Sequence, residues 1–147
     1  MKDETGEYIA RVTDFGYSTV YTGHGRIVMP RTNGWDAPEW GQRGGFTFSE
    51  AQKMDAYSFG LVCFWFLIYK LSDPFDPITL RRQNEDMAAC ARKLIETQWD
   101  LRDPQRERLS MLFSLTLANK PENRSSDFDK LISCLAIKRY LLSFGKA

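Results

Sequence analysis

The sequence predicts an α+β fold that is mainly helical, with one short β segment near its start. A single strand-like run precedes residue 14, helical patterns follow residue 48, and 43% of the 147 residues are hydrophobic, with 14% aromatic. A chain of this length and composition can bury a sizeable core within one domain. The aromatic content also argues against disorder.

The N-terminal third predicts a strand followed by a long loop. Residues 8–12 have the pattern of a short strand, which Asp14 and Gly16 end. Residues 18–35 mix glycine, threonine, proline and asparagine without a sustained period, which is typical of a loop. Loops of this length in compact domains are usually functional or disordered. A glycine-rich turn is expected at residues 41–45.

The middle of the chain predicts a buried central helix. Ser49, with Gln52 three residues later, matches a capping box that would start a short helix. Asp55 then precedes a segment that is apolar around nearly its whole circumference, which is typical of a helix buried on all sides. Its longest apolar run, residues 59–69, is too short to span a bilayer.

Three further helices are expected at residues 80–99, 105–118 and 128–144, because each range spaces its apolar residues for one helical face. The expected core positions are Met87, Cys90, Ala91, Leu94 and Ile95, then Leu109, Leu112, Phe113 and Thr116 or Leu117, and finally Leu131, Leu135 and Leu142.

Charge and cysteine content limit the possible partners and compartment. The 20 Lys and Arg residues nearly balance 19 Asp and Glu, so there is no electrostatic basis for binding nucleic acid or an anionic membrane. Cys63, Cys90 and Cys134 form no Cys-x-x-Cys pair, and His24 is the only histidine, which argues against zinc. With no signal-peptide pattern, we expect a reducing, intracellular and cytoplasmic location.

Four motifs follow one another in a specific order. Asp-Phe-Gly at residues 14–16 precedes Ala-Pro-Glu at 37–39, then Asp-Ala-Tyr-Ser-Phe-Gly at 55–60 and Pro-Glu-Asn-Arg at 121–124. This series resembles the C-terminal lobe of the eukaryotic-type protein kinases, across nearly the whole chain. The resemblance implies a protein-kinase-like fold for residues 1–144, with an activation segment at 8–39 and a helical subdomain at 49–144.

The first motif implies a nucleotide and a metal. In the resemblance, Asp14 holds Mg²⁺ on the phosphates of ATP, Phe15 packs inward, and Gly16 lets the backbone turn. Asp14, Phe15 and Gly16 are therefore the expected cofactor-binding residues, for ATP and Mg²⁺. A strand-ending Asp-x-Gly turn without a metal is the alternative.

The second motif belongs to a segment that resembles a substrate-facing loop. Thr32 matches the threonine of Ser/Thr kinases, and Trp35 fills an aromatic position where tryptophan favours the tyrosine-kinase-like branch. Arg31 stands where the family usually has glycine. A plain loop with a buried tryptophan is the alternative.

The resemblance also implies three structural residues. Glu39 and Arg124 match a buried ion pair that joins this loop to the helical base. Asp55 matches the carboxylate that caps the central helix and holds the backbone of the catalytic loop.

Four hydroxyl residues are candidate phosphorylation sites. Ser18, Thr19, Tyr21 and Thr22 lie between the first two motifs, where kinases are often switched by phosphorylation. A phosphate would add about −1.5 to −2 charges and needs a cationic partner. Ordinary solvated loop hydroxyls are the alternative.

The catalytic residues of a kinase are missing from the sequence. No His-Arg-Asp occurs, and the N-terminal lobe and catalytic loop that precede the first motif in the family are expected to be absent. The leading hypothesis is part of a Ser/Thr protein kinase that acts on protein substrates and is inactive as this fragment. Two alternatives are a non-catalytic kinase-like module that binds a partner protein, and a poorly folding remnant.

Overall fold

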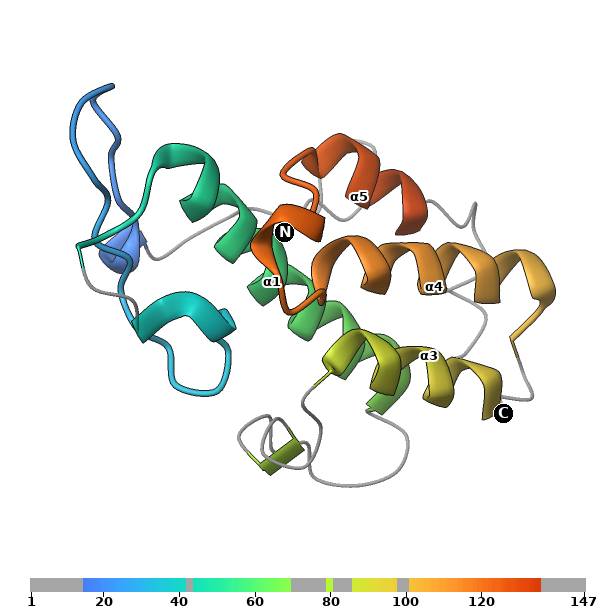
Figure 1. Ribbon diagram of the computed structural model, residues 1–147. Coiled ribbons are helices and arrows are strands. Elements are labelled where there is room, and N and C mark those ends of the chain that lie inside the picture. The colour runs from blue at the N-terminus through green and yellow to red at the C-terminus, as the bar shows by residue number, and fades with distance from the viewer. Residues whose placement is uncertain (1–14, 42–43, 70–78, 81–85, 98–100, 136–147) are drawn as a thin grey trace, which may run out of the picture.

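The computed structural model describes residues 15–41, 44–69, 79–80, 86–97 and 101–135, and this part of the chain is mostly helical (Figure 1). Within it, an isolated antiparallel bridge between Ile27 and Phe46 is the only β pairing. The strand expected at residues 8–12 lies outside the described residues. The main helices are α1 (Phe48–Phe64), α3 (Met87–Thr97), α4 (Asp103–Thr116) and α5 (Phe128–Leu135). Shorter turns are η1 (Phe15–Tyr17), η2 (Pro38–Gly41), the π-helical η3 (Trp65–Tyr69) and η4 (Pro121–Asn123).

The N-cap of helix α1 is Thr47, two residues before the Ser49 cap that the sequence predicted. The Thr47 hydroxyl accepts a hydrogen bond from the Glu50 amide at 3.3 Å, and the Glu50 carboxylate accepts one from the Thr47 amide at 2.7 Å. The Thr47 bonds also hold the pKa of Glu50 below its ordinary value. The predicted box of Ser49 and Gln52 is wrong, because both residues already lie inside the helix.

The other helices differ from prediction mainly at their ends. Asp86 is non-helical and its carboxylate accepts a hydrogen bond from the Ala89 amide at 2.9 Å, so α3 begins after it rather than continuing from residue 80. α4 begins two residues before its predicted start, at Asp103. α5 is described to Leu135, and the rest of the predicted 128–144 helix lies outside the described residues.

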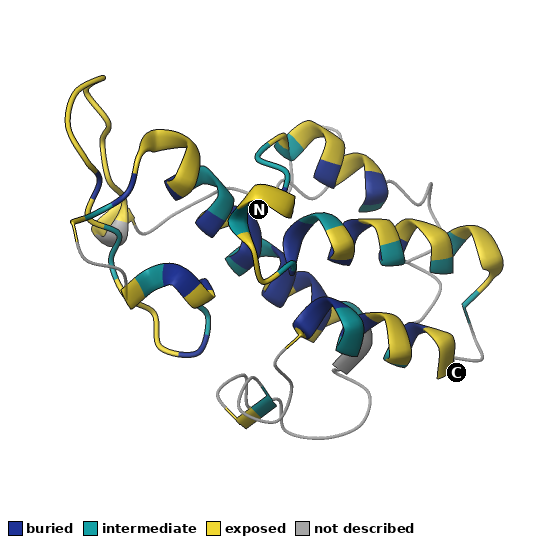
Figure 2. Cartoon of the chain, in the orientation of Figure 1, coloured by how far each residue is buried: buried dark blue, intermediate teal, exposed yellow. Residues whose placement is uncertain are grey.

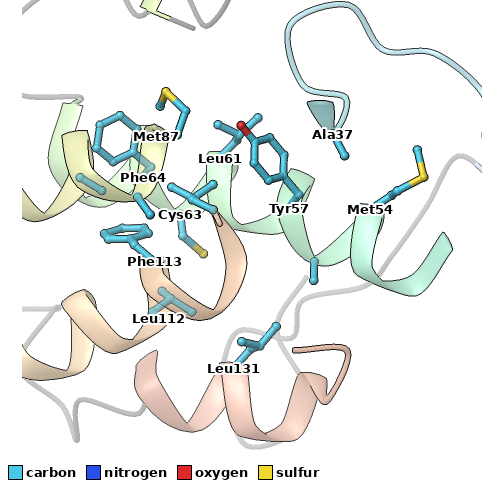
Figure 3. Packing of buried hydrophobic residues seen from close by; sticks show 14 of the residues in the cluster. Ala37, Met54, Tyr57, Leu61, Cys63, Phe64, Met87, Leu112, Phe113 and Leu131 are labelled. Atoms are coloured by element: carbon cyan, nitrogen blue, oxygen red, sulfur yellow. The ribbon is translucent and has the colours of Figure 1, made fainter. Parts of the chain in front are cut away.

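The core forms around α4, which packs against α1, α3 and α5. In Figure 1, α4 lies between α3 and α5. Figure 2 shows the buried residues concentrated along these contacts. Figure 3 shows the packed side chains, whose fully buried members include Tyr57, Leu61 and Phe64 of α1, Leu112 and Phe113 of α4, and Leu131 of α5.

Gly60 allows α1 and α4 to approach closely. A Cβ atom placed on Gly60 would lie 2.6 Å from the Thr116 Cβ and 2.9 Å from a Leu117 methyl carbon. Both distances are shorter than van der Waals contact. The glycine of the third motif is therefore required by helix packing.

The expectation that the apolar run of α1 is buried on all sides is wrong. Val62 is 48% exposed, and Phe66, in the π-helical turn that follows α1, is 56% exposed. Trp65 is 39% exposed and meets Trp35 edge to face. The later helices cover the side that carries Leu61 and Phe64. None of the described helices combines the length and apolarity needed to cross a bilayer.

Candidate functional site

The candidate site lies where residues 15–41 and 44–47, here called the loop segment, fold against the N-terminal half of α1 (Figure 1). The Ile27–Phe46 bridge closes the segment through two backbone hydrogen bonds of 2.7 and 2.8 Å. Arg26 adds hydrogen bonds of 3.0 and 2.7 Å to the Gly45 carbonyl and an ion pair of 3.7 Å with Glu50. The long predicted loop is thus closed at its base beside the start of α1.

The loop then makes a turn at the predicted substrate-facing residues. The carbonyl of Thr32 accepts hydrogen bonds from the amides of Trp35 at 2.9 Å and Asp36 at 3.1 Å. The Ser58 hydroxyl donates to the Trp35 carbonyl at 2.8 Å, which ties the turn to α1. Trp35 is half-buried and meets Trp65 edge to face at 6.3 Å. The predictions did not assign this role to Ser58, although it stands inside the third motif.

Glu39 and Arg124 are brought together across 85 positions of the sequence. Two parallel hydrogen bonds, of 2.7 and 2.9 Å, join the guanidinium to the carboxylate. Arg124 is almost fully buried and Glu39 nearly so. Charge-assisted bidentate pairs of this geometry are among the strong hydrogen-bonded contacts in proteins.

The remaining Arg124 donors are also used. Its Nε donates to the Ala118 carbonyl at 2.6 Å, and its Nη2 to the Asn119 carbonyl at 2.9 Å. The guanidinium lies over the Tyr57 ring, 4.7 Å from the centroid. This one side chain therefore joins the η2 turn, the middle of α1 and the end of α4.

Asp55 does not have the capping role that the sequence predicted. It lies in the middle of α1, because the helix begins at Phe48 and runs through residue 55 without a break. Its carboxylate makes no hydrogen bond or ion pair with the described part of the chain. Partial burial raises the pKa of its carboxyl group, since desolvation disfavours the charged form.

A cavity of about 450 Å³, here called the loop cavity, lies between the loop segment and α1. Its described walls include Thr32 and Asp36 from the turn and Met54, Asp55 and Ser58 from α1. Figure 3 shows Ala37 of the loop segment facing the side of α1 that carries Met54 and Tyr57. A second, more apolar cavity lies beside Trp35 and is lined by Phe59, Val62 and Trp65.

The first motif is only partly described. Asp14 lies outside the described residues, while Phe15 and Gly16 belong to the exposed turn η1. Phe15 is 66% exposed, so among the described residues the expectation that it packs inward is wrong. The described residues contain no group of three His, Cys, Asp or Glu side chains that could hold a metal ion.

The four candidate phosphorylation sites have different surroundings. Ser18, Thr19, Tyr21 and Thr22 are all exposed, but Ser18, Thr19 and Tyr21 also line the loop cavity. The Tyr21 ring stacks on Phe48 at 5.0 Å. All four hydroxyl residues are placed where solvent reaches them.

Neither the protein-family models, nor the curated proteins, nor the solved structures compared with this chain match it.

Proposed function

We propose that this chain is the C-terminal lobe of a Ser/Thr protein kinase domain, which transfers the γ-phosphoryl group of ATP to protein hydroxyl groups. The observation that carries the proposal is the buried Glu39–Arg124 pair. It joins the second and fourth motifs of the series that resembles the kinases, in the role that the resemblance implies. The two residues are far apart in sequence, so their pairing does not follow from local structure.

In such a reaction the described residues would position the protein substrate. Phosphoryl transfer depends on positioning and on electrostatic stabilisation of the transferred group. The Thr32–Asp36 turn is fixed by Ser58 and by the adjacent η2 turn, whose Glu39 is anchored to the helical base. In the proposal this rigid loop orients a protein substrate. In the proposal, ATP and Mg²⁺ are held by Asp14 together with a strand lysine and a catalytic-loop asparagine, which the kinase family carries ahead of the first motif.

The test measures transfer of ³²P from [γ-³²P]ATP to a Ser/Thr-containing protein mixture by the native polypeptide isolated with its natural flanking sequence. We expect incorporation that Asp14→Asn abolishes and that Glu107→Gln, an exposed change on α4, leaves unaltered. Equal incorporation by wild type and Asp14→Asn, or none by wild type, would contradict the proposal. The isolated 147-residue chain is expected to be inactive.

A second candidate function is a non-catalytic kinase-like module that binds a partner protein. The exposed side chains of Val62, Trp65 and Phe66 favour it, because large exposed apolar groups are often interaction sites. This candidate predicts that Mg-ATP does not change the melting temperature of the purified chain. A clear rise in melting temperature with Mg-ATP would exclude it.

A further inference from the structure

Asn33 and Gly34 lie at the centre of the turn that carries the predicted substrate-facing residues. The Thr32 carbonyl accepts a hydrogen bond from the Trp35 amide at 2.9 Å, which closes a four-residue turn around them. Gly34 has a φ of 85°, a backbone conformation that favours glycine. The fold of the turn therefore calls for glycine directly after Asn33.

An asparagine followed by glycine can react with its own backbone. The nitrogen of the glycine attacks the side-chain carbonyl carbon of the asparagine, and no Cβ on the glycine hinders the approach. Asn33 is exposed. Gly34 is a buried residue, but its amide donates no hydrogen bond within the described part of the chain. No such bond therefore has to break before the Gly34 nitrogen attacks.

Arg31 is placed to assist this attack. Its Nη2 donates a hydrogen bond to Oδ1 of Asn33 at 3.3 Å, and its guanidinium lies over the Trp40 ring, 5.0 Å from the centroid. A cationic donor on this oxygen polarises the amide carbonyl and stabilises the negative charge that develops there during the attack. Arg31 stands where the kinases that the chain resembles usually have glycine, so the family pattern does not account for this contact.

We propose that Asn33–Gly34 is a site of spontaneous covalent modification, at which Asn33 loses ammonia to form a succinimide that water opens to aspartate or isoaspartate. The observation that carries the proposal is the exposed Asn33 amide, which is polarised by Arg31 and followed by a glycine that the turn requires. The inference goes beyond the kinase proposal, because the reaction needs only water.

The reaction has two steps and involves no oxidant or reductant. In the first step a bond forms between the Gly34 nitrogen and Cγ of Asn33, and the bond from Cγ to Nδ2 breaks. The proton of the Gly34 amide leaves with Nδ2 as ammonia. In the second step water adds to one of the two ring carbonyl carbons, the bond from that carbon to the ring nitrogen breaks, and the nitrogen regains a proton. Addition at Cγ gives aspartate, and addition at the backbone carbonyl gives isoaspartate.

Both products change the turn. Aspartate places a carboxylate where the Arg31 guanidinium already donates a hydrogen bond. Isoaspartate lengthens the main chain by one methylene group, so the Thr32 carbonyl no longer aligns with the Trp35 and Asp36 amides that donate to it. Formation of isoaspartate therefore loosens the turn that Ser58 ties to α1.

Ageing the full wild-type chain at neutral pH and body temperature tests the site. Peptide mass spectrometry follows the conversion of each asparagine in the same sample, and electron-transfer fragmentation identifies isoaspartate. We expect Asn33 to convert at least about tenfold faster than Asn123, an exposed asparagine that is followed by Arg124. Equal rates at the two positions, or no conversion of Asn33 over weeks, overturns the proposal. This comparison does not depend on the folding of any variant.

Variants separate the role of Arg31 from that of the Asn-Gly pair. Arg31→Met should slow the conversion of Asn33 at least about threefold, whereas Arg92→Met on the exposed face of α3 should leave the rate within about twofold. An unaltered rate in Arg31→Met overturns the assistance by Arg31.

Hydrogen exchange measures the effect on the turn. The Trp35 and Asp36 amides should exchange faster in the aged wild-type chain than in the fresh chain. In Asn33→Gln they should not change with age, because the longer glutamine side chain closes a larger ring far more slowly. Unaltered exchange in a wild-type chain that contains isoaspartate overturns the predicted loosening.

Discussion

Arg124 uses its whole guanidinium group inside the protein. Besides the Glu39 carboxylate, it contacts the carbonyls of Ala118 and Asn119 and the ring of Tyr57. Such a side chain is costly to replace, because its removal leaves a buried carboxylate without a partner and several carbonyls without a donor. The contribution of the pair is therefore best measured by removing one partner and then both.

Arg124→Met is expected to lower the free energy of unfolding by about 3–5 kcal/mol, since Glu39 stays buried and unpaired. Urea denaturation followed by circular dichroism measures the change. Arg92→Met, on the exposed face of α3, is the control and should cost less than about 0.5 kcal/mol. The double variant Glu39→Gln/Arg124→Met should lose less than the sum of the two single variants. Additive losses, or a loss no larger than that of Arg92→Met, would contradict the coupling.

Asp55 makes stability depend on pH in a direction that its environment determines. Its pKa is raised in the folded state, so the folded protein binds this proton more tightly than the unfolded chain. Its contribution to stability is therefore greatest below the unfolded pKa of about 3.9 and decreases as pH rises through the folded pKa. Asp55→Asn should stabilise the protein at pH 7, with the advantage over wild type shrinking toward pH 4. A difference that is constant between pH 4 and 7 would disprove this account.

Single residues show what the sequence could predict of the site. Glu39 and Arg124 were identified from motif order alone, and the structure brings them together. Asp55 and Phe15 received roles that the described structure does not show, because those roles require neighbouring segments. Local sequence identifies a residue type, but a cap or a buried ring depends on what lies next to it in space.

Among the elements, the start of α1 depends on a choice between two overlapping capping sequences. Thr47 with Glu50 and Ser49 with Gln52 both fit the capping-box pattern. In the structure Thr47 is the N-cap residue of α1. It directly follows Phe46, whose bridge with Ile27 brings the end of the loop segment to the start of the helix. The long-range pairing that determines the choice is not visible in local sequence.

Thr47→Ala should reduce the free energy of unfolding by about 0.5–2 kcal/mol, the usual cost of losing an N-cap side chain. Ser49→Ala is the matched control, because Ser49 is already helical and should tolerate alanine. Thermal denaturation of both variants provides the comparison. If Ser49→Ala proves the more harmful, the helix begins where the sequence alone suggested.

The crossing of α1 and α4 depends on Gly60. Alanine there would gain up to about 1 kcal/mol in helix propensity, yet its methyl group would clash with Thr116 and Leu117. Overpacking costs about 1–3 kcal/mol, so Gly60→Ala should be destabilising overall. Gly41→Ala, where a Cβ meets nothing within 4 Å, is the control and should be near neutral. A stabilised Gly60→Ala protein would show that the two helices can separate at little cost.

For the whole molecule, helical periodicity predicted the later helices well, because their apolar faces meet one another. It failed for the apolar run that begins in α1 and continues into η3. Val62, Trp65 and Phe66 are as apolar as Leu61 and Phe64, and only the packing of α3 and α4 on one side separates the two groups. Composition predicts that a residue is apolar, while its burial depends on which elements cover it.

Thiol labelling tests whether the whole chain holds this packed core rather than being a poorly folded remnant. Cys63 is buried in α1, and burial raises its pKa to about 11, so only about 10⁻³ of it is thiolate at pH 8. Cys90 on α3 is only partly buried. With Ellman's reagent at pH 8, Cys90 should react first and Cys63 at least about a hundred-fold more slowly, since labelling of Cys63 requires the core to open.

Cys90→Ser should remove the fast phase of labelling, and guanidinium chloride should make all three thiols reactive. Equal rates for Cys63 and Cys90 without denaturant would mean that the helices around α1 do not form a stable core.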